Sequence, residues 1–583
     1  MQSCRGAGGA LLRAGLLTLT LAVAGCDASG CGQAGPGTGP AGSGTAAAGE
    51  ATSVQITVVG TSDLHGRLST LPLLGGYVDV LRGKNPGGVV LVDAGDMFQG
   101  TLESNANEGE AVIAAYRKLA YDAVAIGNHE FDYGPVGPAS VPVKKPKDGE
   151  NNDPRGAIKA RAAQAEGAFP MLSANILEDG KALSWRNVAP SVTVVKRGVS
   201  VGIIGVSTMG TPSTTIAANV QDITMKPVAK AIEDEAKALR ASGVKVIVVA
   251  AHAGGACTDN DAPADLSSCE KDSEIFEVAR ALPAGTVQVI VAGHTHKAIA
   301  HEVNGIAIVQ SNAYGTALGR VDLTVDRATG EVTRTEIHPP EPVKSGNKLE
   351  GATVWPAAAV EEVILPAVDL AAAKRAEGLN TVLSAPFPAK YREESALGNM
   401  VTSLLLEAVP GADIAVANGG GLRAELPAGE LSYGALYDAL PFDNRVARLW
   451  MKGRALKETI VKNLTGKSGI LSLGGARVVG RCEGGKLAVD VFLTGGKKAE
   501  RKVADDAEVQ IVTNEFLATR GDDFGPGDRV QIDEEGPPFR ELIAAELKKR
   551  GGTMTPEEWV IPGKPRIDLP GPIGESVCRA RKK

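Results

Sequence analysis

The stretch Tyr121-Asp-Ala-Val-Ala-Ile-Gly-Asn-His-Glu-Phe-Asp132 is the most informative part of the chain. Its apolar first half predicts a buried strand that ends at Gly127, and Asn128, His129 and Asp132 follow at once. An amide, an imidazole and a carboxylate at the end of a buried strand each need a partner, because water is scarce there. We therefore expect matching polar groups elsewhere in the chain.

Four further β-branched runs end in the same kinds of side chain. In α/β folds, functional groups gather outside the carboxyl ends of strands, so we expect these runs to converge on one site, with helices such as 110–119 and 228–240 in the connections. A single His or Asp at such a place is more often structural. A functional site is favoured here because five of the seven histidines of the chain lie at the ends of these five runs. The polar residues at these run ends are Asp63 and His65, Asp96, Asn128 and His129, His252, and His294 and His296.

The residue types at these run ends indicate a metal centre. Asp, Asn and His side chains without Cys suit divalent ions such as Mn, Zn, Fe or Co, and the sequence does not choose among these metals. The ligands are numerous enough for two divalent metal ions that share a bridge.

The order of these blocks resembles a known family. Asp63-x-His65, Gly95-Asp96, Gly127-Asn-His-Glu130, His252 and Gly293-His-Thr-His296 resemble the blocks of the calcineurin-like metallophosphoesterases. The full run from Gly127 to Asp132 resembles the 5'-nucleotidase family, which includes periplasmic UDP-sugar hydrolases. The resemblance implies an α/β fold: an N-terminal four-layer αββα metallophosphoesterase sandwich joined by a helix to a C-terminal α+β substrate-binding domain.

The resemblance also implies a role for each residue. Asp96 would bridge the two metals, and a metal-bridging water would attack phosphorus. His129, oriented by Asp132, would be the catalytic imidazole. The remaining ligands would be Asp63, His65 and His296 for one metal, and Asn128, His252 and His294 for the other.

The C-terminal half contains candidate nucleotide contacts. Phe442 and Phe516 could clamp a planar base by stacking, or could simply be core residues. Arg392 lies one residue away from the place where the family carries a phosphate-contacting arginine, so its role stays open. By resemblance, the substrate-binding residues would be Asn418, Arg423, Phe442, Asn444, Phe516 and Asp522.

The first 26 residues predict a signal peptide that ends in a lipobox, with Cys26 as the lipidated residue; a plain secretory signal is the alternative. We therefore expect an exported protein that is lipid-anchored to a bacterial membrane, at the periplasmic side or the cell surface. The expected segments are the signal 1–26, a flexible tether 27–52, a catalytic domain 53–340, a linker with a helix 341–380, a substrate-binding domain 381–570 and a basic tail 571–583.

Two further features concern loops and cysteines. The Pro-, Lys- and Asp-rich segment 134–160 predicts a solvated surface insertion. In an oxidising compartment Cys257 could pair with Cys269, and Cys482 with Cys578, although spacing alone does not fix the connectivity.

The leading functional hypothesis is a phosphohydrolase that acts on 5'-nucleoside monophosphates. The alternatives are the same chemistry on 2',3'-cyclic nucleotides, 3'-nucleotides or UDP-sugars, and a non-catalytic nucleotide-binding surface lipoprotein. A formal net charge of -7 argues against binding a nucleic-acid polymer, and the sequence predicts no obligate protein partner.

Overall fold

The computed structural model describes residues 52–137, 141–142, 151–494, 500–519, 524–525, 527–533, 537–574 and 577–578. Cys26, the tether up to residue 51 and Asp522 lie outside these residues. The predictions made for them therefore stay predictions.

The N-terminal part is built on two sheets. One sheet has seven strands in the order β16-β15-β1-β2-β3-β4-β7, and the other has six in the order β13-β14-β12-β11-β9-β8. The strands are β1 Ser53–Thr61, β2 Val89–Asp93, β3 Ala123–Ala125, β4 Met171–Leu172, β7 Val188–Ala189, β8 Ser191–Lys196, β9 Val199–Ser207, β11 Val246–His252, β12 Val289–Ala292, β13 Ala298–Val303, β14 Ile306–Ser311, β15 Ala317–Asp326 and β16 Val332–Pro342. The neighbours β1, β2 and β3 run parallel in the first sheet, as do β9, β11 and β12 in the second.

The apolar runs are buried on both faces because a sheet lies on one side of each strand and helices lie on the other. In β2, Val90 and Val92 belong to the core between the two sheets, whereas Val89 and Leu91 pack under the helices. Successive residues of a strand point to opposite faces, so a continuous apolar run fills both cores.

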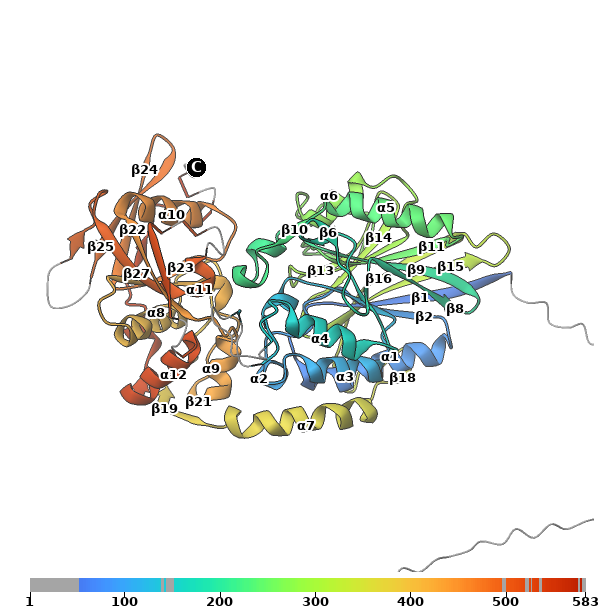
Figure 1. The fold of residues 1–583 in the computed structure, drawn as a ribbon, viewed down its shortest axis with the longest axis horizontal. Coiled ribbons are helices and arrows are strands. Elements are labelled where there is room, and N and C mark those ends of the chain that lie inside the picture. The colour runs from blue at the N-terminus through green and yellow to red at the C-terminus, as the bar shows by residue number, and fades with distance from the viewer. Residues whose placement is uncertain are drawn as a thin grey trace, which may run out of the picture. The chain divides into compact units, whose positions relative to one another are not determined.

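Helices cover both outer faces and complete the predicted four-layer αββα sandwich. Figure 1 shows α5 and α6 on one side of the two sheets, and α1 and α3 on the other. The bounds are α1 Leu71–Lys84, α3 Glu110–Leu119, α4 Gly156–Ala165, α5 Val228–Ala241 and α6 Glu274–Ala281. The predicted helix 110–119 therefore agrees with α3, and the helix predicted over 228–240 agrees with α5 to within one residue.

The linker helix and the C-terminal part also follow the predicted class. Helix α7, Ala358–Arg375, packs against α3 and α1. The C-terminal part mixes three sheets with helices, in strand orders β23-β20-β27-β22-β28, β21-β19-β29 and β26-β25-β24-β30. The bounds are β19 Gly378–Leu383, α8 Ala396–Ala408, β20 Ile414–Asn418, β21 Gly429–Ser432, α9 Tyr433–Ala439, β22 Val446–Lys452, α10 Gly453–Thr465, β23 Leu471–Gly474, β24 Ala476–Glu483, β25 Lys486–Leu493, β26 Arg501–Lys502, β27 Glu508–Asn514, α11 Glu515–Ala518, β28 Arg529–Ile532, α12 Phe539–Arg550, β29 Gly552–Met554 and β30 Ile567–Asp568.

Both expected disulfides are formed, Cys257 with Cys269 and Cys482 with Cys578. The first closes a short loop just after β11. The second ties the C-terminal end of the described chain to β24.

The prediction of a solvated loop over 134–160 is wrong at its C-terminal end. Helix α4 starts at Gly156, and its first turn is buried. The side chain of Arg155 is buried as well, and it forms ion pairs with Glu178 and Asp222. A buried guanidinium needs such partners, so this end of the segment is anchored to the domain.

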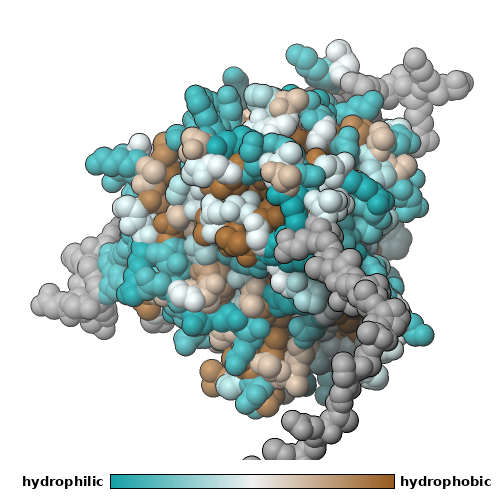
Figure 2. All heavy atoms as spheres, turned by 90° about the vertical axis from the view of Figure 1, so that its right-hand side faces the viewer, coloured by the Kyte–Doolittle hydropathy of each residue, from teal (hydrophilic) through white to brown (hydrophobic). Residues whose placement is uncertain are grey.

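The face of the molecule shown in Figure 2 is mostly hydrophilic, with hydrophobic side chains scattered among polar ones. Scattered apolar side chains are ordinary on a protein surface. Among the described residues, no helix combines the length and the apolar character that a membrane span requires.

Candidate functional site

The polar run ends predicted from the sequence meet at one place in the N-terminal part. Asp63, His65 and His296 place one ligand atom each within 4.8 Å of one another, and so do Asp96, His252 and His294. Because β1, β2 and β3 end in one sheet and β11 and β12 in the other, the site lies where the carboxyl ends of both sets of parallel strands come together.

Asp96 stands between the two groups of ligands. Its Oδ2 atom is 3.1 Å from His252 Nε2 and 3.8 Å from His65 Nε2, so it faces one histidine of each group. Its Oδ1 accepts a hydrogen bond of 2.8 Å from the backbone N–H of His129. The side chain is therefore fixed in a place from which it can reach both groups.

Backbone carbonyl groups orient two of the histidines. His65 Nδ1 lies 2.8 Å from the carbonyl oxygen of Gln99, and His252 Nδ1 lies 2.8 Å from that of Ala94. A carbonyl oxygen can only accept, so each Nδ1 carries the proton and the Nε2 atom of a neutral ring presents a lone pair.

The donor set fits divalent cations. His252 Nε2 lies 3.0 Å from Asn128 Oδ1 and 3.1 Å from Asp96 Oδ2, which are both acceptors. Lone pairs that face each other at this distance repel unless a positive charge lies between them. Nitrogen and oxygen ligands of this mixture suit Mn, Zn, Fe or Co, as expected from the sequence.

Burial and neighbouring charges shift the pKa values of these groups. Burial raises the pKa of the Asp63 carboxyl to about 7 and lowers that of His294 to about 3. Burial also opposes a charge on His252, but the negative charges of Asp96, Asp63 and Glu130 and a hydrogen bond to Asp96 together raise the pKa of His252 to about 10.

Strained backbone accompanies the ligands. Asp63, His65, Asp96, His294 and His296 all have positive φ angles, between 49° and 76°. Residues other than glycine rarely adopt this conformation, and it is concentrated at functional sites. The surrounding hydrogen bonds have to hold these residues in place.

His129 and Asp132 form a pair beside the ligands. His129 Nδ1 lies 2.6 Å from Asp132 Oδ2, and the other oxygen of Asp132 accepts a hydrogen bond of 2.7 Å from Thr215 Oγ1. Burial opposes protonation of His129, but the charges of Asp132 and Asp96 raise its pKa above the ordinary value. The sequence did not single out Thr215, because an isolated threonine has no distinctive pattern.

A cavity of about 670 Å³ connects this place to the predicted nucleotide contacts. It is lined from the N-terminal part by Asp96, Asn128, His129, Asp132, His294 and His296, and from the C-terminal part by Asn418, Arg423, Phe442, Asn444 and Phe516. A volume of this order is typical of small-molecule sites.

Two residues link the sides of the cavity. The Arg423 guanidinium reaches toward the metal ligands, with Nη2 3.4 Å from His65 Nε2. The ring of Phe442 lies 5.5 Å from that of His129, measured between centroids. A cation and an aromatic face are thus held next to the candidate catalytic imidazole.

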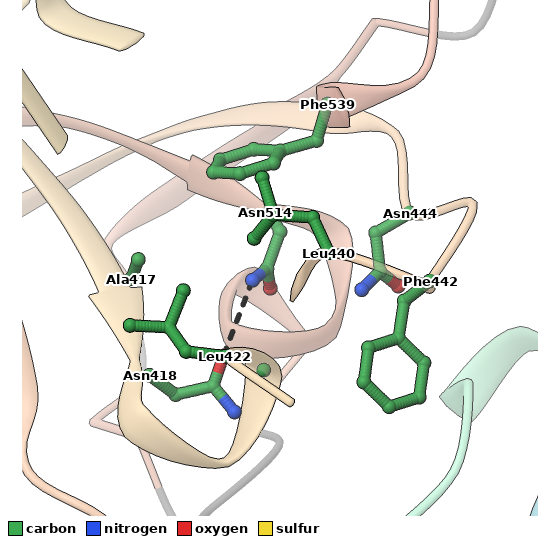
Figure 3. Close-up of a pocket in the computed structure, with 9 residues that line it drawn as sticks. Ala417, Asn418, Leu422, Leu440, Phe442, Asn444, Asn514 and Phe539 are labelled. Carbon is green, nitrogen blue, oxygen red and sulfur yellow. Dashed lines mark hydrogen bonds between the residues drawn. The ribbon is translucent and has the colours of Figure 1, made fainter. Parts of the chain in front are cut away.

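The predicted base contacts surround a smaller pocket on the C-terminal side. Figure 3 shows Asn418, Phe442 and Asn444 lining it, together with Asn514, whose amide donates a hydrogen bond of 3.3 Å to Asn418 Oδ1. Phe516 is half-buried and packs partly against the neighbouring core, so it is both a core residue and a cavity residue.

Arg392 lies elsewhere. Its Nη1 donates to the carbonyl of Ser468 at 2.5 Å. Arg392 is not among the described residues that line the cavity. The neighbouring Tyr391 does line the cavity, as does Lys467. Neither was predicted from the sequence, because an exposed tyrosine or lysine in a loop has no distinctive pattern.

Comparisons with known proteins identify both parts. Residues 56–298 match the family described as calcineurin-like phosphoesterase, and residues 374–526 match the 5'-nucleotidase C-terminal domain. The solved structure of a 5'-nucleotidase precursor from Thermus thermophilus superposes with a TM-score of 0.69 at 24% identity, over 88% of this chain and 99% of that one, and so shares the fold.

Curated relatives show the same relationship in sequence. Endonuclease YhcR of Bacillus subtilis is 28% identical over 74% of this chain, which spans only 33% of that relative's length. A 5'-nucleotidase of Vibrio cholerae is 27% identical over 69% of this chain and 74% of its own. The chain thus contains a calcineurin-like phosphoesterase domain followed by a 5'-nucleotidase C-terminal domain.

Proposed function

We propose that the protein is a metal-dependent phosphohydrolase that releases phosphate from nucleotides, most simply from 5'-nucleoside monophosphates. One observation carries the proposal: members of both groups of metal-type ligands and a set of nucleotide-type contacts line the same cavity. Relatives whose names describe 5'-nucleotidases support the same choice.

The ligands would hold two divalent cations, one at Asp63, His65 and His296 and the other at Asn128, His252 and His294, with Asp96 between them. When bound, such ions lower the pKa of water and neutralise charge on phosphoryl oxygens. Arg423 adds a fixed positive charge on the opposite wall, where it can bind a phosphoryl oxygen.

His129 would act on the leaving group. Asp132 holds the Nδ1 side of the ring, so Nε2 is the nitrogen that remains for substrate. A proton held at Nε2 would pass to the ester oxygen as the bond to phosphorus breaks. Thr215 keeps Asp132 in line with the ring.

The nucleoside would lie against the C-terminal wall. Phe442 and Phe516 supply aromatic faces for the base, and Asn418 and Asn444 supply hydrogen-bonding amides beside them. The predicted ribose contact Asp522 belongs to the same proposal.

The test is phosphate release by the full chain, stripped with a chelator and then reloaded with single divalent ions. The panel holds 5'-nucleoside monophosphates, 3'-nucleotides, 2',3'-cyclic nucleotides, UDP-glucose and ribose 5-phosphate. We expect activity only after metal is restored, and the highest kcat/KM on a 5'-monophosphate. Absence of metal-dependent phosphate release from every nucleotide would leave only the non-catalytic alternative.

A matched variant separates the two halves of the site. Phe442→Ala should lower kcat/KM for a 5'-nucleotide by about tenfold, because stacking on one base contributes roughly 1–3 kcal/mol. Hydrolysis of ribose 5-phosphate, which has no base, should be unchanged. Equal losses on both substrates would contradict the role of Phe442 in holding the base.

The protein is further proposed to be exported and anchored by a lipid on Cys26, on the evidence of the sequence of residues 1–26. The same activity assay, applied to cell fractions, tests it. Wild-type activity should sediment with membranes, and Cys26→Ser should release it. Activity that sediments equally in both would exclude the anchor.

A further inference from the structure

Glu130 is a buried carboxylate that the proposed reaction does not use. Its exposed fraction is 1%, and its two oxygens accept hydrogen bonds from three backbone N–H groups. Oε2 accepts from Asp96 at 2.9 Å and from Gly127 at 2.6 Å, and Oε1 accepts from Met97 at 2.8 Å. All three donors belong to the loops that follow β2 and β3.

These two loops are packed backbone against backbone. A Cβ atom on Gly127 would lie 2.3 Å from Asp96 Oδ1 and 2.8 Å from Glu130 Oε2, so only glycine fits there. The carboxylate of Glu130 lies beside this contact and bonds to both loops.

Asp96 needs this support because its backbone is strained. Its φ angle is +58°, in the left-handed region. The bonds from the N–H groups of Asp96 and Met97 to Glu130 fix the peptide units on either side of the Asp96 Cα, and with them the direction of its side chain. That direction decides whether Oδ2 lies between His252 and His65.

We infer that Glu130 is a positioning residue that sets the Asp96 carboxylate between the two ligand groups, and thereby allows two metal ions to be held together. The inference rests on the proposed metal centre. A carboxylate is required because the donors approach both oxygens. A glutamine would turn its NH₂ group toward at least one backbone N–H, which leaves that donor unpaired.

The test compares Glu130→Gln and Glu130→Asp with Asp322→Asn. Asp322 is a buried carboxylate in the same domain, 7% exposed, outside both ligand groups, so its variant matches the loss of a charge and the expected loss of stability. The probe is Mn²⁺, measured by equilibrium dialysis with metal analysis and by low-temperature electron paramagnetic resonance, which detects the magnetic coupling of two adjacent Mn²⁺ ions.

We expect Glu130→Gln to weaken binding of one of the two Mn²⁺ ions by about 10–100-fold, the range found when residues that orient metal ligands are changed, and to lose the coupled signal. Excess Mn²⁺ should restore part of the coupling. Glu130→Asp keeps the charge but is shorter, and it should weaken binding less; it also serves if the glutamine variant does not fold. Asp322→Asn should bind two coupled Mn²⁺ ions like the wild type.

Two results would overturn the inference: wild-type affinity and coupling in both Glu130 variants, or the same loss of coupling in Asp322→Asn. Both readouts are independent of the nucleotide. A wild type that binds two coupled ions yet hydrolyses no nucleotide would therefore reject the proposed function and keep this inference. A wild type that binds no divalent ion, whether Mn²⁺, Zn²⁺, Fe²⁺ or Co²⁺, would reject both.

Discussion

At the scale of single residues, the proposed chemistry depends on His129, which lies beside the candidate metal ligands and is held by Asp132. Replacement by alanine removes a proton donor without removing a ligand. We therefore expect His129→Ala to lower kcat by about 10²–10⁴-fold, the usual range for an acid–base group, at unchanged metal content. Phosphate release together with metal analysis of the same sample measures both.

The matched control is His338→Ala. His338 Nε2 also pairs with an aspartate, Asp322, at 2.9 Å. His338 is not among the described residues that line the cavity. Its loss should leave kcat unchanged. If His129→Ala kept near-normal turnover, the imidazole would have no catalytic role.

The sequence predicted the ligands better than the residues that orient them. His, Asp and Asn after apolar runs are visible as a pattern, and the structure brings all of them together. No sequence pattern marks the groups that orient the ligands and His129, which are the carbonyl oxygens of Gln99 and Ala94 and, through Asp132, the hydroxyl of Thr215. Every residue has a carbonyl, and Thr215 reaches Asp132 from 83 positions away.

At the scale of elements, Asp322 on β15 holds three strands together. It accepts a hydrogen bond from Thr57 on β1, and it pairs with His338 on β16 and with Arg320. Burial alone would raise the pKa of Asp322, but the bonds from His338 and Thr57 and the charge of Arg320 hold it well below the ordinary value.

This shift predicts a pH dependence of stability. A depressed pKa means that the stabilisation is complete above the unfolded value of about 3.9 and is lost as the pH falls through the lower folded value. Asp322→Asn should therefore lower the free energy of unfolding by about 2 kcal/mol at pH 7, and by progressively less below about pH 4. Urea unfolding at several pH values measures the difference. A constant difference down to pH 2 would show that the charge is not involved.

Elements were predictable where their pattern was local. The five apolar runs form β1, β2, β3, β11 and β12, and the predicted helix 110–119 agrees with α3. The solvated loop predicted over 134–160 was wrong at its C-terminal end because the prediction rested on the Pro-, Lys- and Asp-rich composition. Arg155 and the start of α4 are buried there, and the ion-pair partners of Arg155 lie far along the chain. Tertiary contacts of that kind override local composition.

At the scale of the whole molecule, the site is shared between two parts of the chain that the sequence could pair only by family resemblance. The sequence leaves Phe442 and Phe516 open as base-stacking or core residues, and it does not say that they lie near His129 or the cavity. The structure brings Phe442 to the ring of His129, and both phenylalanines line one cavity with the metal ligands. Distances between such remote segments follow from packing, which no local pattern encodes.

Gln99 connects the N-terminal part of the chain to the C-terminal part. Its backbone carbonyl orients His65, and its side-chain amide donates to the carbonyl of Pro441 at 3.1 Å; Asn105 donates to the same carbonyl at 3.1 Å. Pro441 directly precedes Phe442, so the two amides hold the loop that carries the aromatic face against the segment that orients a metal ligand. They should therefore contribute to binding the nucleotide and not to the chemical step.

Gln99→Ala keeps the backbone carbonyl for His65 and removes only the bond to Pro441. Since one such bond contributes about 1 kcal/mol, we expect KM for a 5'-nucleotide to rise about fivefold, with kcat and metal content unchanged, and a further rise in the double variant with Asn105→Ala. Asn107→Ala is the matched control, because the Asn107 amide bonds within its own segment, to Glu103. Steady-state kinetics are measured with a 5'-nucleotide and with ribose 5-phosphate. Because only the nucleotide has a base to contact Phe442, the rise in KM should be seen with the nucleotide alone. An unchanged KM in the double variant would mean that Pro441 keeps its place without these amides, and that Phe442 is positioned by the C-terminal part alone.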